Sequence, residues 1–159
     1  MSNIKSLDEI LSIRESFRKD NKKIVFTNGV FDIIHAGHVD YLTKAKALGD
    51  LLIVGLNGDA SVKRIKGEYR PIVPESQRAF VLSNLKPVDY VVIFEEDTPA
   101  NLIDKIIPDI LIKGADWSLD NIVGKDTVLK NGGEVKTIEF ENQQSTSNII
   151  QTILERYST

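Results

Sequence analysis

The sequence predicts an α/β protein built on one doubly wound sheet of parallel strands. Along its 159 residues, short apolar runs alternate with longer amphipathic stretches, as β-α repeats do. The first four runs are nearly continuous and rich in β-branched residues, which is typical of strands buried on both faces. No linker or repeat divides the chain, so residues 1–159 are expected to form a single domain, with residues 1–21 as a helical extension.

Five apolar runs are the expected strands, which predicts a five-stranded, Rossmann-like sheet. They are residues 24–27, 51–56, 90–94, 110–112 and 135–140. Right-handed crossovers would join them, and ligands bind such sheets beyond the carboxyl ends of the strands, where the winding reverses direction. We therefore expect the chemistry just after the first strand and after the last two.

The expected helices occupy the stretches between these strands and at the two ends. They are residues 7–17, 37–48, 74–85, 98–107 and 146–157. Thr98 is expected to cap the fourth of these helices, with Pro99 as its first residue. In the last helix, the spacing of the apolar residues predicts an inward face that consists of Ile149, Ile150, Ile153 and Leu154.

Composition excludes several classes of protein. The chain carries 20 basic and 23 acidic side chains, and this acidic surplus argues against a nucleic-acid partner. It contains no cysteine, which excludes disulfides, thiolate metal sites and a thiol nucleophile. No apolar run approaches the roughly 20 residues that span a bilayer, so no membrane partner is expected. These features suit a cytoplasmic enzyme.

Both histidines of the chain, His35 and His38, follow the first strand with a glycine between them. If a helix begins near His35, both rings lie on one face of its first turn, where free N–H groups attract anions. Gly37 leaves room for a phosphate to approach the backbone. This predicts a site that stabilises charge on a phosphate during in-line displacement. A metal pair or a simple helix cap are the alternatives, and no third metal ligand is recognisable.

The string G-V-F-D-I-I-H-A-G-H, residues 29–38, resembles the H-x-G-H signature of the nucleotidyltransferase superfamily. The resemblance implies that His35 and His38 contact the nucleotide phosphates and act in catalysis. It also implies nucleotide-binding roles for Gly29, Val30, Phe31 and Gly37, and it places Asp32 with the substrate. Cytidylyltransferases carry threonine where this chain has Val30, so only main-chain groups can serve at that position.

A basic segment follows the second strand. Arg64 and Lys66 are suited to clamp two phosphates, although a solvated basic loop is the simpler interpretation of these residues alone. The string K-R-I-K-G-x-x-R-P-I-V-P-x-x-x-R, residues 63–78, closely resembles the heptose 1-phosphate adenylyltransferases. The resemblance implies a catalytic role for Lys66 and substrate-binding roles for Asn57 and Arg64.

Two further strings complete the expected site. In K-G-A-D-W, Gly114 and Asp116 are suited to contact a ribose, and the heptose family has a closely similar string. Ser145, Thr146 and Ser147 form an N-cap signature, and the superfamily holds the β- and γ-phosphates at this position. Phe140 stands where cytidylyltransferases have an arginine, which favours the heptose branch.

The resemblance implies transfer of AMP from ATP to a heptose 1-phosphate, with Mg²⁺ on the triphosphate, for lipopolysaccharide core or related glycan precursors. The phosphate acceptor is already largely ionised at neutral pH, so no general base is needed. Because superfamily members are often dimers, we expect a homodimer. The adenylyltransferase is often fused to a sugar kinase; here we expect another protein to supply the heptose 1-phosphate.

Other functions stay open. A cytidylyltransferase acting on glycerol 3-phosphate or an FMN adenylyltransferase would use the same site. A non-catalytic nucleotide-binding regulator and a structural module are the alternatives outside enzymes.

Overall fold

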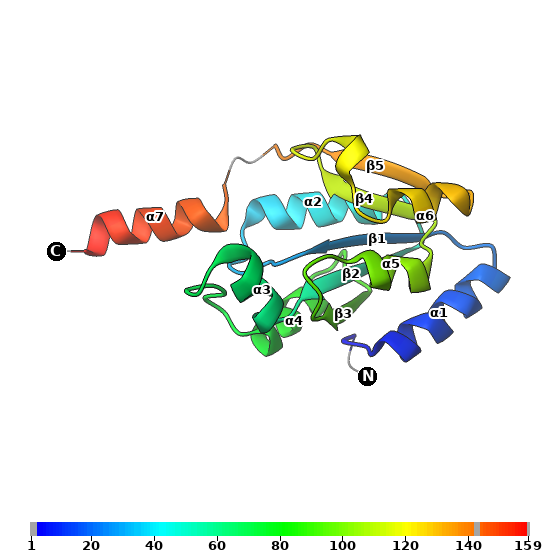
Figure 1. The fold of residues 1–159 in the computed structure, drawn as a ribbon, viewed down its shortest axis with the longest axis horizontal. Helices are drawn as coiled ribbons and strands as arrows, with labels where there is room; N and C mark the ends of the chain where they lie inside the picture. Colours follow the sequence, from blue (N-terminus) through cyan, green and yellow to red (C-terminus); the bar gives the residue numbers. More distant parts are fainter. Residues whose placement is uncertain (1–2, 142–143, 159) are drawn as a thin grey trace.

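The computed structural model describes residues 3–141 and 144–158 and contains a five-stranded parallel sheet in the order β3-β2-β1-β4-β5 (Figure 1). The strands are β1 (Ile24–Gly29), β2 (Leu51–Asn57), β3 (Tyr90–Phe94), β4 (Ile110–Gly114) and β5 (Glu134–Ile138). This order reverses direction between β1 and β4, which confirms the predicted doubly wound fold. It also places a ligand-binding crevice at the carboxyl ends of these two central strands.

Helices cover both faces of the sheet. They are α1 (Leu7–Lys19), α2 (Ala36–Lys46), α3 (Asp59–Lys66), α4 (Glu75–Ser83), α5 (Ala100–Ile106), α6 (Lys125–Lys130) and α7 (Thr146–Tyr157), with a short 3-10 turn at Leu119–Asn121. One apolar core joins the sheet to α2 and α4, and a second joins its other face to α1, α5 and α6. All seven residues of β2 are buried, as the continuous apolar run predicts.

Strands β1 and β4 extend beyond their apolar runs into polar residues. Asn28 and Gly29 continue β1, and Lys113 and Gly114 continue β4, because parallel pairing persists after the core-facing residues end. These polar residues therefore lie at the edge of the sheet where the crevice opens. Their positions are fixed by ladder hydrogen bonds and not by loop structure.

Three helical details differ from the sequence-based expectation. Residues 59–66, which we expected to form a loop, are the helix α3, and α6 was missed because six residues carry little periodicity. Helix α5 begins at Ala100 with Pro99 in the capping position, so Thr98 lies outside the helix.

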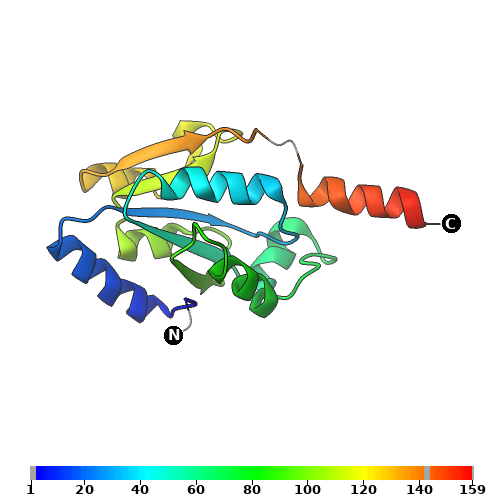
Figure 2. The ribbon, with the colours of Figure 1, turned by 180° about the vertical axis from the view of Figure 1, so that it is seen from behind.

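The expectation of an inward face on the last helix is wrong. Helix α7 has the predicted bounds, but it projects away from the body of the molecule (Figures 1 and 2). Ile153 and Leu154 are 49% and 53% exposed. The spacing of apolar residues shows that a helix has an apolar face, and it does not show what covers that face. No helix in the described part of the chain is long and apolar enough to cross a membrane.

Candidate active site

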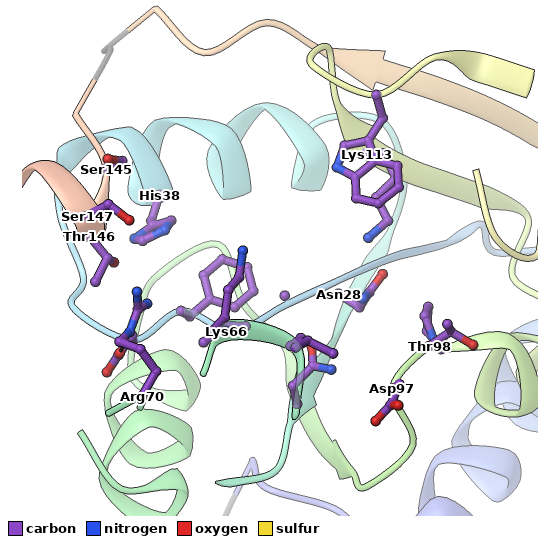
Figure 3. A pocket seen from close by; sticks show the side chains of 18 of the residues that line it. Asn28, His38, Lys66, Arg70, Asp97, Thr98, Lys113, Ser145, Thr146 and Ser147 are labelled. Atoms are coloured by element: carbon purple, nitrogen blue, oxygen red, sulfur yellow. Dashed lines mark hydrogen bonds and ion pairs between the residues drawn. The ribbon is translucent and has the colours of Figure 1, made fainter. Parts of the chain in front are cut away.

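A cavity of about 520 Å³ opens at the carboxyl edge of the sheet, where β1 and β4 end (Figure 3). Residues 28–32 form its floor, and His38 of α2 and Ser145–Ser147 before and within α7 line one end. Lys66 and Arg70 come from the segment after β2, while residues 97–99 and Lys113 line the other end. The chain thus brings five segments that are distant in sequence around one space.

The two histidines lie at the start of α2. His35 is the N-cap residue, with extended backbone (φ −141°, ψ 172°), and His38 lies in the first turn. Their rings stack with centroids 3.8 Å apart. The rings of His38 and Phe31 are inclined to each other, with centroids 5.2 Å apart. The predicted pairing of the histidines on one helical turn is therefore present, with His38 facing the cavity and His35 stacked against it.

Hydrogen-bonding capacity is left unfilled at this site. Among the described residues, three buried side-chain polar atoms have no hydrogen-bond partner: Nδ1 of His35, Nδ1 of His38 and Oδ1 of Asn28. Buried polar atoms without partners are uncommon and unfavourable in folded proteins. All three lie near the carboxyl end of β1 and the start of α2, which indicates that a ligand completes their hydrogen bonding.

Burial also favours the uncharged form of both imidazoles. Desolvation lowers the pKa of His35, and desolvation together with the neighbouring charge of His35 lowers the pKa of His38 to about 4. Both rings are therefore neutral at neutral pH. A bound phosphate would oppose this effect, because nearby negative charge favours the protonated imidazole.

The N-terminus of α7 adds a second anion-binding helix end. Ser145 is the N-cap residue, and its hydroxyl accepts a hydrogen bond from the Asn148 N–H at 3.0 Å. Thr146 is buried, and its hydroxyl contacts the backbone N–H and carbonyl of Ile33, both at 3.4 Å. Ser147 is exposed and lines the cavity. Two helix N-termini thus converge on the same end, where their N–H groups favour anions.

Asp32 lines the cavity and also anchors a loop. Its carboxylate is fully buried and accepts hydrogen bonds from Nε of Arg70 (2.6 Å) and from the backbone N–H groups of Ile72 (2.9 Å) and Val73 (2.8 Å). Burial alone would raise the pKa of Asp32, but these donors hold it below its usual value. The carboxylate thus holds the loop between α3 and α4, and its contact with a substrate stays a prediction.

The basic residues after β2 do not all face the cavity. Lys66 ends α3 and lines the cavity, as expected. Arg64 does not line it: its Nε donates to Asp97 at 2.6 Å, and its side chain is half exposed. Arg70 lines the cavity, whereas Arg64, the first member of the predicted phosphate clamp, lies outside the lining, so a substrate contact of Arg64 stays a prediction. The sequence did contain a sign of this role of Arg70, because it is the arginine of the R-P pair in the string at residues 63–78.

Sequence reasoning also missed the residues at the other end of the cavity. Lys113, at the end of β4, holds its amine 5.3 Å from the centre of the Trp117 ring. Desolvation lowers its pKa to about 8, although Asp116 opposes this shift. Asn28, at the end of β1, lines the same space. The signal for both was present, because each follows directly on an apolar run.

A side pocket of about 170 Å³ adjoins the main cavity at Asn28 and Lys113. Gly114, Asp116 and the aromatic rings of Trp117, Tyr41 and Phe140 line it. Phe140 stacks on Tyr41 at 5.1 Å and lies against Gly114, where an added Cβ would come within 2.3 Å of its ring. The predicted ribose residues Gly114 and Asp116 thus line a side pocket that shares His38 and residues 28–31 with the main cavity.

A buried arginine that sequence reasoning did not single out holds the rim together. Arg78 of α4 donates to the carbonyl oxygens of Val30 (2.7 Å), Asn57 (2.9 Å) and Val73 (2.8 Å). It also pairs with Asp59 at 2.7 Å. Asn57 lines the cavity, and its side-chain amide donates to Ser61 at 3.0 Å.

A family model described as cytidylyltransferase-like matches residues 26–152, which include every part of this cavity. The chain belongs to the cytidylyltransferase-like family of nucleotidyltransferases. The predicted superfamily is therefore confirmed, and the paired histidines stand in the context that the resemblance implied.

Individual relatives agree with this family. A bifunctional protein HldE from Campylobacter concisus is 58% identical over 153 residues, which are 96% of this chain and 30% of that protein. A bifunctional protein HldE from Pelobacter propionicus is 52% identical over 157 residues, 99% of this chain and 32% of that protein. The chain thus spans about a third of the length of these relatives.

Solved structures give the same result. A lipopolysaccharide core biosynthesis protein from Thermoplasma volcanium is 33% identical, with a TM-score of 0.63 over 77% of this chain and 99% of that one. A pantoate–β-alanine ligase from Francisella tularensis, 17% identical, has a TM-score of 0.60 over 98% of this chain and 78% of that one. The second likeness concerns the fold alone.

This nucleotidyltransferase cavity gathers most of the predicted site residues. Those that line it include Gly29, Val30, Phe31, His38, Asn57, Lys66, Ser145, Thr146 and Ser147. Gly37 is buried within α2 and lies outside the lining. Among the described residues, no three His, Asp or Glu side chains are grouped to hold a metal ion.

Replacing Arg70 should weaken triphosphate binding, whereas replacing Arg64 should not. Because Arg70 lines the cavity and Arg64 is paired with Asp97 outside it, we expect Arg70→Met to raise the Kd for ATP about tenfold or more. The matched Arg64→Met variant should stay within about twofold of the wild type. Calorimetric titration with ATP and Mg²⁺ measures both; a larger loss in the Arg64 variant would contradict this assignment.

Burial of His38 should make the stability of the protein sensitive to acid. The pKa is 6.5 in the unfolded chain and about 4 in the fold, so between these values only the unfolded chain binds the proton. Stability is therefore lost as the pH falls through this window. Lowering the pH from 7 to 5 should reduce the free energy of unfolding of both the wild type and His38→Gln. The reduction should be about 1–2 kcal/mol smaller in His38→Gln, which lacks the buried imidazole. Denaturant titrations at both pH values measure this, and equal losses would contradict it.

Proposed function

We propose that the chain transfers AMP from ATP to a heptose 1-phosphate, giving ADP-heptose and pyrophosphate. The observation that carries the proposal is the stacked histidine pair at the N-terminus of α2, opposite the N-terminus of α7, with unfilled imidazole nitrogens between them. These groups are suited to a triphosphate. The heptose acceptor is supported by the string at residues 63–78 and by relatives named for lipopolysaccharide core biosynthesis and as HldE.

The proposed mechanism is positioning and charge stabilisation. An oxygen of the sugar phosphate attacks the α-phosphate of ATP in line, a new P–O bond forms, and the bond to the pyrophosphate oxygen breaks. The attacking phosphate has a second pKa near 6, so it needs no general base. His38, Lys66 and the N–H groups of α7 stabilise charge on the triphosphate, and His35 supports the His38 ring by stacking.

In this scheme Mg²⁺ would bind together with ATP. Asp32, the carboxylate at the floor of the cavity, already accepts hydrogen bonds from Arg70 and two backbone N–H groups. Mg²⁺ commonly binds phosphate oxygens and water and takes few protein ligands. We therefore place Mg²⁺ on the triphosphate oxygens. A chain that uses ATP and a sugar phosphate would work in the cytoplasm.

Both histidines should be required for turnover. We expect His35→Ala and His38→Ala each to lower kcat by about 100-fold or more, because groups that stabilise transition-state charge contribute that much. The measurement is release of pyrophosphate from ATP and heptose 1-phosphate, with circular dichroism to check the fold. Folded variants with near-normal turnover would contradict the mechanism.

An acceptor screen tests the reaction itself. The wild-type chain is incubated with each of the four NTPs and with α- or β-heptose 1-phosphate, glycerol 3-phosphate or FMN, and pyrophosphate is followed. We expect ATP with a heptose 1-phosphate to give the fastest release. Faster release with CTP and glycerol 3-phosphate, or with ATP and FMN, would replace this assignment by another transferase. Nucleotide binding without release from any pair would favour a regulator.

We also propose that the chain forms a homodimer through α7. Its exposed Ile153, Leu154 and Tyr157 form an apolar face on a projecting helix, and such faces are usually covered. Leu154→Lys should therefore convert a dimer into a monomer in light scattering, whereas Thr152→Lys should not, because a lysine there leaves the apolar residues intact. A monomeric wild-type protein would contradict the proposal.

A further inference from the structure

Asn28 and Lys113 stand side by side at the end of the cavity opposite the histidines. Their strands are paired with Phe26 opposite Leu111, and continuing this register sets Asn28 beside Lys113 on the same face of the sheet. Both side chains line the cavity. In Figure 3 they project into the part of the space that lies away from His38 and Ser145–Ser147, with Thr98 and Asp97 nearby.

These two side chains offer complementary groups that the protein does not use. Oδ1 of Asn28 is a buried acceptor without a donor. The ion pairs and hydrogen bonds of the described residues do not include the amine of Lys113, which lies over the Trp117 ring. With a pKa of about 8, that amine is mostly protonated at neutral pH and can donate. An acceptor and a donor held together fit a ligand group that both donates and accepts, and a hydroxyl does so.

This end of the cavity matches a triphosphate less well than the other end does. Oδ1 of Asn28 would face phosphate oxygens there, acceptor against acceptor. Among the described residues, Lys113 is the one cation that lines this end, whereas Lys66 and Arg70 both line the other. Phosphate oxygens are better matched at the other end, by the helix N-termini, Lys66 and Arg70. The side pocket, with its aromatic rings, is suited to the flat base and its ribose. Hydroxyl groups of the second substrate remain as the best match for Asn28 and Lys113.

We propose that Asn28 and Lys113 bind the polyhydroxylated part of the acceptor, Asn28 accepting from one sugar hydroxyl and Lys113 donating to another. This inference rests on the proposed transfer to a sugar phosphate. It makes both residues determinants of acceptor specificity, because a buried amide oxygen left without a donor penalises acceptors that lack the hydroxyl. The acceptor phosphate would then point toward Lys66 and the histidines, where the transfer takes place.

Two nearly isosteric variants test the inference. Asn28→Leu and Lys113→Met remove the polar groups with little change in volume. We expect the KM for heptose 1-phosphate to rise about 10- to 100-fold in each, because a hydroxyl loses its partner. Both residues also border the side pocket, so we expect the KM for ATP to change as well, but by a smaller factor than the KM for the acceptor. Lys105→Met, at an exposed lysine of α5 outside the cavity, should change neither. A raised KM for ATP with an unchanged KM for the acceptor would overturn the inference.

A binding measurement separates this inference from the proposed reaction. If the wild type releases no pyrophosphate with any sugar phosphate, the proposed function fails. Calorimetric titration with mannose 1-phosphate, and with methyl phosphate as the acceptor without hydroxyls, then decides the subsite. Tighter binding of mannose 1-phosphate that is lost in Asn28→Leu and Lys113→Met supports it. Equal binding of both phosphates, or equal binding by wild type and variants, overturns it.

Discussion

The buried guanidinium of Arg78 is the interaction on which the shape of the site depends. It accounts for three backbone carbonyl oxygens at once: those of Val30 after β1, Asn57 at the end of β2 and Val73 before α4. Each of these carbonyls is at a point where regular pairing stops, so without Arg78 they would need other donors. A planar group with five N–H donors is suited to this task, whereas a lysine could not reach all three in fixed directions.

Asp32 extends the same arrangement toward the cavity. By accepting from Arg70 and from two backbone N–H groups, it converts the loop after α3 into a rigid wall. The charge of Arg70 is thereby held at the phosphate-binding end with little freedom to lose on binding. Ordering such groups in advance lowers the entropic cost of ligand binding. The position of a cavity-lining cation therefore depends on a buried carboxylate behind it.

Most of the fold was predictable from sequence, because it follows from patterns that are local. Nearly continuous apolar runs predicted the first four strands and a mixed run of apolar and polar residues predicted the fifth, while Ser145 before an apolar stretch predicted the start of α7. The paired histidines predicted an anion site for the same reason, since three-residue spacing on a helix fixes their mutual position. In each of these cases the local structure is determined by residues that are close together in the sequence.

Side-chain direction was less predictable, because it depends on distant segments. Arg64 and Arg70 look equivalent in sequence, but Asp97 draws one outward and Asp32 draws the other to the cavity wall. Asp32 itself is held by a distant segment, the loop at residues 70–73, which donates to its oxygens. Lys113 and Asn28 belong together only through the pairing of β1 with β4, strands separated by about half of the chain.

Helix α7 begins at the cavity and projects away from the body of the molecule. Its N-terminus brings Ser145–Ser147 to the cavity, and the contacts of Thr146 with Ile33, both at 3.4 Å, attach it there. The remaining turns extend away from the body with residues 151–158 exposed. The contacts that position Ser145–Ser147 at the cavity are therefore made at one end of α7, and its exposed apolar residues play no part in them.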